Sequence, residues 1–286
     1  VADFAAAVAG RHGDASLAVL FYGSCLWADR LDGLMLDFYL VVDDYAAAYA
    51  GAWLARANAL VPPNVFYAEH GALVAKYAVL TLADLDRLCG PETRSVSVWA
   101  RFAQPSRLAW VRDEGARRGV VAAVARAAPT LLVAARPLLP RQVGVVRLWT
   151  EAFALTYTAE LRTERAARGQ TLFDAQSDRY RRFTAPALEA AGLAARIEGD
   201  ALTFVDDADA RAGARAWAMR RRHGKLMSLV RLVKASFTFD GGIDYLAWKI
   251  ERHSGTRVTV RPWMRKVPIA AGLWLLPQLV RRGAVR

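Results

Sequence analysis

One stretch of the sequence, Phe21 to Asp44 (FYGSCLWADRLDGLMLDFYLVVDD), limits most strongly what this chain can fold into. Its apolar run from Leu34 to Val42 has the length and composition of a buried strand, but it contains one acid, Asp37. A carboxylate is costly to bury unless it is paired or binds a cation. The run therefore predicts either a binding site at Asp37 or a core strand whose aspartate is satisfied locally.

A Gly23-Ser24 turn lies thirteen positions before Asp37. Glycine lets the backbone approach a ligand closely, and free N–H groups at a turn or helix start bind phosphate. A phosphate cradle together with a metal-binding carboxylate is the minimum needed to move a nucleotidyl group from a nucleoside triphosphate. An ordinary turn followed by a core strand is the alternative interpretation of the same residues.

The composition favours a globular protein with an anionic partner. The 286 residues are 55% hydrophobic and 23% charged, which fits one large or two ordinary domains. The net charge of +12 suggests nucleic acid, anionic lipid or nucleotide as a partner. Residues 252–286 contain eight Lys and Arg and no Asp or Glu. Two cysteines without a CxxC pattern and four scattered histidines argue against a zinc site or a disulfide framework.

Hydrophobic periodicity changes along the chain, from alternation and short runs before about Glu114 to helical spacing after it. In the first part we expect helices at 2–10, 45–60 and 82–89, strands at 17–22 and 34–42, and a hairpin at 64–80. In the second part we expect helices at 115–135, 141–168, 180–193, 208–234 and 243–252, and a hairpin at 197–204. Helices that accompany a small hairpin suggest a winged-helix-like module.

Several short motifs, taken in their order and spacing, carry a resemblance to a known family. They are Tyr22-Gly23-Ser24, Met35-Leu36-Asp37-Phe38, Val41-Val42-Asp43-Asp44, Val65-Phe66-Tyr67, Lys76-Tyr77, Ala100-Arg101-Phe102 with Pro105, and the segment from Ala154 to Arg162. Together with the basic, apolar C-terminal tail they resemble the mitochondrial-type phosphatidate cytidylyltransferases (CDP-diacylglycerol synthases), which have bacterial relatives. Residues 166–250 contribute little to this resemblance.

The resemblance implies an α+β chain in three parts. These are a nucleotidyltransferase-fold domain at 1–115, a helical, winged-helix-like domain at 116–255 and a basic amphipathic tail at 256–286. The implied reaction converts CTP and phosphatidic acid to CDP-diacylglycerol and pyrophosphate with Mg²⁺. The implied location is peripheral, on the cytoplasmic face of a bacterial inner membrane, or on the matrix side of the mitochondrial inner membrane in a eukaryote. We expect no nucleic-acid partner, and the sequence leaves the oligomeric state open.

The carboxylates of this site are expected to bind the metal. Asp37 is the expected catalytic metal ligand, but the alternate strand position, where a second acid often stands, is Tyr39. Glu160, on the long predicted helix, is the expected second ligand, with a structural ion pair as its alternative. Asp43 and Asp44 are further candidates, although six residues of extended strand put Asp43 roughly 20 Å from Asp37.

The remaining site residues are expected to bind the nucleotide phosphates. Gly23 and Ser24 would cradle the triphosphate, Lys76 would hold a phosphate as a point charge, and Arg101 would clamp one bidentately. The alternatives are an edge-strand lysine that guards against aggregation at Lys76 and a surface ion pair at Arg101. The chain departs from the family at Cys25, where glycine is frequent, and it lacks the lysine that often precedes the proline after the arginine motif.

The tail is the expected membrane-binding element. Its apolar segment 267–280 is too short to span a bilayer, whereas Trp263, Arg265, Lys266 and Trp274 suit the headgroup boundary. A C-terminal helix packed on the protein core is the alternative. Two other functions stay open at this stage: a nucleotidyltransferase with another acceptor, and a degenerate nucleotidyltransferase fold that binds nucleic acid.

Overall fold

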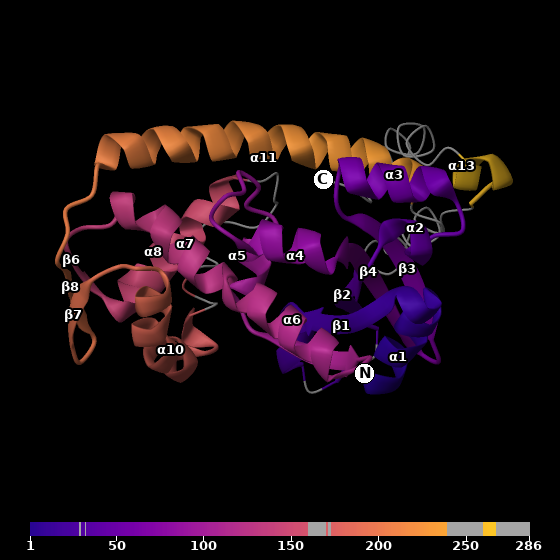
Figure 1. The fold of residues 1–286 in the computed structure, drawn as a ribbon, viewed down its shortest axis with the longest axis horizontal. Coiled ribbons are helices and arrows are strands. Elements are labelled where there is room, and N and C mark those ends of the chain that lie inside the picture. The colour runs from indigo at the N-terminus through magenta and orange to yellow at the C-terminus, as the bar shows by residue number, and fades with distance from the viewer. Residues whose placement is uncertain (29, 32, 160–169, 171–172, 239–259, 267–286) are drawn as a thin grey trace, which may run out of the picture. The chain divides into compact units, whose positions relative to one another are not determined.

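The computed structural model describes residues 1–28, 30–31, 33–159, 170, 173–238 and 260–266. Helices and strands are mixed along the chain (Figure 1), so the expected α+β class is confirmed. The chain divides into two compact units, which we call the sheet unit and the helical unit. The sheet unit contains Val1–Leu80, Leu108–Trp110 and the described residues from Leu229 onward, and the helical unit contains Thr81–Arg107 and Val111–Ser228. The predicted domain boundaries were at residues 115 and 255, whereas these two units meet near residues 81, 107–111 and 228.

A five-stranded sheet forms the centre of the sheet unit. Its strand order is β3-β4-β2-β1-β5, with bounds Asn64–His70, Leu73–Thr81, Met35–Val42, Ser16–Tyr22 and Ser106–Val111 in that order. The antiparallel pair β1 and β2 places Tyr22 opposite Asp37, and the hairpin of β3 and β4 places Tyr67 opposite Lys76. Because β4 lies beside β2, Asp37 and Lys76 are on neighbouring strands. The strands and the hairpin expected before residue 81 are confirmed.

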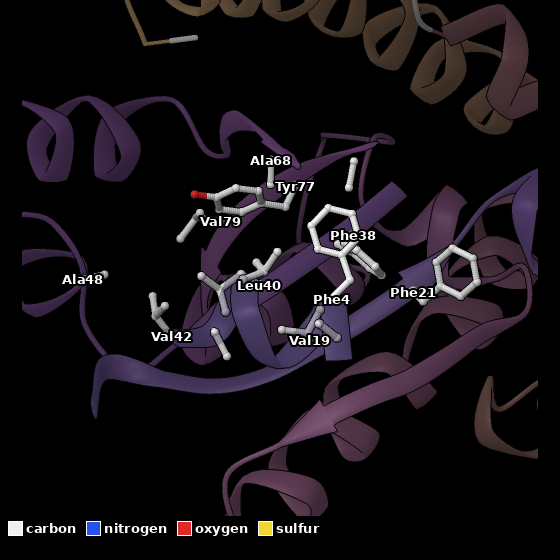
Figure 2. Close-up of a cluster of buried hydrophobic side chains, with 14 of the residues drawn as sticks. Phe4, Val19, Phe21, Phe38, Leu40, Val42, Ala48, Ala68, Tyr77 and Val79 are labelled. Atoms are coloured by element: carbon white, nitrogen blue, oxygen red, sulfur yellow. The ribbon is translucent and has the colours of Figure 1, made fainter. Parts of the chain in front are cut away.

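The two faces of β2 have different roles. Alternate residues from Leu36 to Val42 belong to the core cluster that Figure 2 shows, together with side chains of β1, β3 and β4. Helix α1 (Ala2–Gly10) contributes Phe4, whose ring centroid lies 5.6 Å from that of Phe38. The other face carries Asp37, Tyr39 and the fully buried Val41. Asp37 is therefore the one charged residue in a row that otherwise consists of Met35, Tyr39 and Val41.

The expected helix at 45–60 consists of two helices, so that prediction is wrong in part. Helix α2 (Tyr45–Ala48) is capped by the Asp44 carboxylate, which accepts hydrogen bonds from the backbone N–H groups of Ala46 and Ala47. Helix α3 (Ala52–Leu60) starts again after Gly51. Glycine is a poor residue for a helix interior, and here it precedes a new first turn. Asp44 is thus a helix cap and not a second site carboxylate.

The helical unit has its own aromatic core and its own small sheet. Its helices are α4 (Leu82–Cys89), α5 (Trp99–Phe102), α6 (Glu114–Ala125), α7 (Ala127–Ala135), α8 (Val145–Ala159), α10 (Ser177–Ala190) and α11 (Ala210–Thr238) up to Ser228. The rings of Trp149 and Tyr180 lie 4.9 Å apart, and Trp149 Nε1 donates to Thr184 Oγ1 at 3.0 Å. The likeness to a winged helix stays a prediction.

Two sequence predictions in the helical unit are corrected. The expected hairpin is present as β7 (Ala195–Glu198) and β8 (Ala201–Phe204), but β6 (Gln142–Gly144) joins it where a helix was expected. A strand of three residues is too short to show alternation in the sequence. The expected helix at 115–135 is divided between α6 and α7 at Arg126, whose guanidinium pairs with Asp86 and Glu92.

One segment of the described chain, Glu114–Leu138, is long and apolar enough to cross a membrane by length and composition. Half of its most apolar window is buried inside the protein, and Val120 and Leu131 are fully buried. A core helix has the same properties, and these burials favour that interpretation. Two expected segments lie outside the described residues: the helix at 243–252, and residues 160–168 of the helix expected at 141–168.

Candidate active site

The corner between β1 and β2 depends on Gly23. Its backbone has φ 88° and ψ −171°, a region that is essentially restricted to glycine. A Cβ atom built on Gly23 would lie 3.0 Å from Asp37 Oδ2, closer than side-chain carbons normally approach. Both the turn and the position of the carboxylate therefore require glycine here. Ser24 follows directly, as the first residue of the short 3-10 helix η2 (Ser24–Trp27).

Asp37 and Lys76 form an ion pair across the two neighbouring strands. Lys76 Nζ lies 3.1 Å from Asp37 Oδ1, and their side chains are 47% and 21% exposed. Asp37 Oδ1 is itself buried and accepts no hydrogen bond from any described residue. The contact therefore supplies an opposite charge without the directed geometry of a hydrogen bond. The structure brings together three residues that the sequence predicted for one site: Gly23, Asp37 and Lys76.

The strand order also decides one alternative for Lys76. Strand β4 lies between β3 and β2, so Lys76 is not on an edge strand, and the interpretation as an edge guard is wrong. Its neighbours Ala75 and Tyr77 point into the core cluster, which places Lys76 on the opposite face together with Asp37. On that face the ammonium group has the Asp37 carboxylate as its counter-charge.

Cys25 fixes η2 against the start of β2, a role that the sequence did not suggest. Its thiol donates a hydrogen bond to the backbone oxygen of Met35, with 3.3 Å between sulfur and oxygen. Burial, followed by the nearby Asp37 charge, raises the pKa of the Cys25 thiol, so the side chain stays protonated. Cys25 does not have a positive φ, so this backbone does not require glycine at position 25. In α4, burial likewise raises the pKa of the Cys89 thiol to about 12.

The side chains at the site limit how the predicted Mg²⁺ could be bound. Within the described parts of the chain, no group of three or more His, Cys, Asp or Glu side chains is placed to hold a metal. Asp44 is a helix cap, and the expected second ligand Glu160 lies outside the described residues. Mg²⁺ is commonly bound through one or two carboxylates plus substrate phosphates. The site therefore fits an ion that arrives with a triphosphate, with Asp37 as its protein ligand, better than an ion held by protein alone.

The other predicted site residues lie in segments of the chain distant from this corner in sequence. Arg101, in α5 of the helical unit, donates to the backbone oxygen of Ser97 and, at 2.7 Å, to the Ser97 hydroxyl. Helix α13 (Pro262–Lys266) carries Trp263, which is 39% exposed, and ends with Arg265 and Lys266. Trp274 lies outside the described residues. The nucleotide-binding role of Arg101 and the membrane-binding roles stay predictions.

The sheet unit also contains a pair of basic side chains, Arg231 and Lys234, whose contacts were not predicted from the sequence. Near the end of α11, Lys234 Nζ donates to the backbone oxygens of Val61 and Pro63, the latter at 2.7 Å, and Arg231 Nε donates to Pro62 O at 3.1 Å. Burial, followed by the charge of Arg231, lowers the pKa of Lys234 to about 7. The sequence signal was only a basic helix, because nothing in it indicates which loop the cations contact.

Comparison with known proteins adds little to this geometry. No protein-family model matches the chain, and no curated protein matches it. Among solved structures, the chain is similar to a nucleotidyltransferase-like protein from Exiguobacterium sibiricum. The two share 10% sequence identity over 96% of this chain and 88% of that chain, with a TM-score of 0.27. A score this low does not identify a shared fold.

Proposed function

We propose that the protein is a nucleotidyltransferase that converts CTP and phosphatidic acid to CDP-diacylglycerol and pyrophosphate at a membrane surface. The observation that carries the proposal is the convergence of Gly23, Asp37 and Lys76 on one corner of the sheet. The three residues come from different segments and combine a close backbone approach, a carboxylate and a cation. Binding and positioning a metal-bound triphosphate requires these three chemical features.

Each residue has a distinct task in this mechanism. The Gly23-Ser24 backbone would face the phosphates, Lys76 would bind a phosphate oxygen, and Asp37 would hold a divalent cation, which would supply neutralisation of phosphate charge. An oxygen of the acceptor's phosphate attacks the α-phosphorus of CTP. The bond between that phosphorus and the oxygen bridging to the β-phosphorus breaks, and pyrophosphate leaves with the electron pair. The Cys25 thiol is buried and protonated and is therefore a poor nucleophile, and with direct attack by the acceptor catalysis consists of positioning and charge neutralisation.

The membrane part of the proposal depends on charge and on the tail. The chain carries a net charge of +12, and its last segment combines basic residues with tryptophans and leucines. In the described part of the tail, Trp263 has 39% of its surface open to solvent, whereas the next residue, Met264, is fully buried. Basic residues attract anionic headgroups, and tryptophan suits the boundary between headgroups and acyl chains. A bilayer that contains phosphatidic acid offers the substrate and the anionic surface together.

One observation favours a second candidate function. The described residues supply a single carboxylate at the site, and that carboxylate is already paired with Lys76. A nucleotidyltransferase fold that had lost its chemistry and bound nucleic acid would also combine a basic surface with an incomplete metal site. Transfer to an acceptor other than phosphatidic acid is the third possibility, and one assay separates the three.

The assay incubates the protein with CTP labelled in the cytosine ring, Mg²⁺ and liposomes that contain phosphatidic acid, and then extracts the lipid. Label in the lipid phase that is absent with an Asp37→Asn variant supports the proposal. Release of pyrophosphate without labelled lipid would indicate another acceptor. No turnover of any triphosphate, combined with retention of labelled RNA or DNA on a filter, would favour the binding module. Liposome flotation with and without phosphatidic acid separately measures whether the protein binds the membrane.

A further inference from the structure

We propose that Lys76 is a built-in counter-ion for Asp37, so that the site takes a divalent cation only together with a triphosphate. In the resting protein the ammonium group occupies the position beside Asp37 that the cation needs. The triphosphate draws Lys76 onto a phosphate oxygen and releases the carboxylate to the metal. This inference concerns the regulation of the proposed active site and therefore rests on the proposed function.

The environment of the Asp37 carboxylate disfavours a free metal ion. Asp37 Oδ1 is buried, and its described contact is with Lys76 Nζ at 3.1 Å, while Oδ2 faces the backbone of Gly23. A free divalent cation at Oδ1 would have to displace the ammonium or bind beside a like charge. The described residues offer no cluster of acids that would compensate for this repulsion. The resting site is therefore poorly suited to a free metal ion.

Lys76 can leave this contact easily. Nearly half of its side chain is exposed, at 47%, so the ammonium group can be hydrated as it moves. Its contact with Asp37 is ionic and lacks a directed hydrogen bond, and exposed ion pairs of this kind contribute little to stability. Lysine is also a compact charge on a flexible stem, which suits a change of partner. The ion pair can therefore open without disturbing the sheet.

The charge balance of the occupied site favours joint binding of metal and triphosphate. With Lys76 and Asp37 paired, the corner is close to neutral, and a divalent cation alone would leave it strongly positive. A metal–triphosphate complex remains anionic, so both Lys76 and the metal find partners when it binds. Because Gly23 has no side chain, the Asp37 carboxylate lies close to the backbone of the turn, where both the metal and a phosphate would have to bind. Metal and nucleotide are consequently expected to bind as one unit.

The test measures Mn²⁺ binding by electron paramagnetic resonance, first without any nucleotide. We expect weak binding to the wild type and about tenfold tighter binding to Lys76→Met, because the substitution removes a like charge a few ångströms from the incoming cation. Lys76→Arg is the matched control, since it keeps the charge and should bind as weakly as the wild type. The double variant Asp37→Asn/Lys76→Met should lose the gain.

A second series adds a CTP analogue whose α,β-bridge cannot be cleaved. The analogue should tighten Mn²⁺ binding in the wild type much more than in Lys76→Met. Equal Mn²⁺ affinity of wild type and Lys76→Met without nucleotide would overturn the inference, as would a gain that survives in the double variant. Because Mn²⁺ binding is measured without turnover, its outcome is independent of whether the protein catalyses the proposed reaction. Coupled binding without any labelled lipid product would refute the reaction and leave the counter-ion role in place.

Discussion

Two lysines of the sheet unit are held in opposite ways. Lys76 is half-exposed, faces the carboxylate of Asp37 and makes no directed hydrogen bond to it. Lys234 is half-buried and donates to the backbone oxygens of Val61 and Pro63. One lysine thus has an ionic partner and access to water, whereas the other has fixed carbonyl partners and partial desolvation.

We infer from this difference that Lys76 can change partners, whereas Lys234 stabilises the loop that it contacts. A charge–charge contact at an exposed position is screened and readily replaced by another anion. Hydrogen bonds to loop carbonyls lock a geometry, and breaking them leaves polar backbone groups unsatisfied. We therefore expect substitutions at the Gly23–Asp37–Lys76 corner to affect nucleotide chemistry first, and substitutions at Lys234 to affect stability first.

The largest expected effect is that of Asp37→Asn on transfer. Removing the charge deletes the metal ligand, so we expect the rate of label transfer from CTP to fall by about a hundred- to a thousandfold. The free energy of unfolding should change by less than about 1 kcal/mol, because Lys76 can be hydrated once its partner is neutral. Steady-state kinetics and urea unfolding of the same preparation measure both. A folded variant with wild-type turnover would remove Asp37 from the site.

Gly23→Ala comes next and tests whether the corner is rigid. The substitution places a side chain in a backbone region that non-glycine residues rarely adopt, at a cost of about 1–3 kcal/mol, and directs it at the Asp37 carboxylate. We expect a lower unfolding midpoint together with weaker triphosphate binding. Gly10→Ala is the matched control, since a Cβ there meets nothing within 4 Å and Gly10 has no positive φ. Equal midpoints for the two variants would contradict the strained corner.

Lys76→Met sharpens the comparison by removing one lysine and leaving the other. We expect the affinity for CTP with Mg²⁺ to fall by about tenfold, the effect of one lost phosphate contact, with little change in liposome binding. Titration calorimetry gives the nucleotide affinity and flotation gives the lipid affinity. An unchanged calorimetric affinity would return Lys76 to a purely structural role.

The smallest expected effect concerns the pH dependence of the Lys234 contact. The pKa of Lys234 is lowered to about 7 in the folded protein from an ordinary value of 10.5, so the unfolded chain binds more protons between these values. Stability should therefore rise with pH from about 7 towards 10.5, and the neutral amine still has two N–H groups for Val61 and Pro63. Thermal midpoints at pH 7 and pH 9 should increase more for the wild type than for Lys234→Met. Parallel pH profiles would contradict this assignment.

The sequence allowed the local parts of this site to be predicted, but not their assembly. The apolar run around Asp37 and the Gly23-Ser24 turn are short-range signals, and both elements are present where they were expected. The pairing of Asp37 with Lys76 depends on β4 lying beside β2, a contact between distant segments that periodicity does not encode. The break at Gly51 was missed because alanine-rich spacing favoured one continuous helix.

The helical unit was predicted less completely for similar reasons. The turn at Gly199-Asp200 allowed the β7–β8 hairpin to be predicted. Strand β6 is defined by its pairing with β8, and its three residues are too few to show hydrophobic alternation in the sequence. The division between α6 and α7 occurs at Arg126, whose partners Asp86 and Glu92 are distant in sequence. Arg101 was assigned to phosphate by its motif alone, and its described hydrogen bonds to Ser97 are local.

The state of the two native thiols has a practical consequence for spectroscopy. Cys25 and Cys89 are both buried, and burial raises the pKa of each, so little reactive thiolate is present at neutral pH. A new cysteine at an exposed position such as Trp27 would react with a spin label or fluorophore well before either native thiol. The native cysteines, including the contact between Cys25 and Met35 that supports the corner, would stay intact. Motions at this corner can therefore be followed in a Trp27→Cys variant that carries a single label.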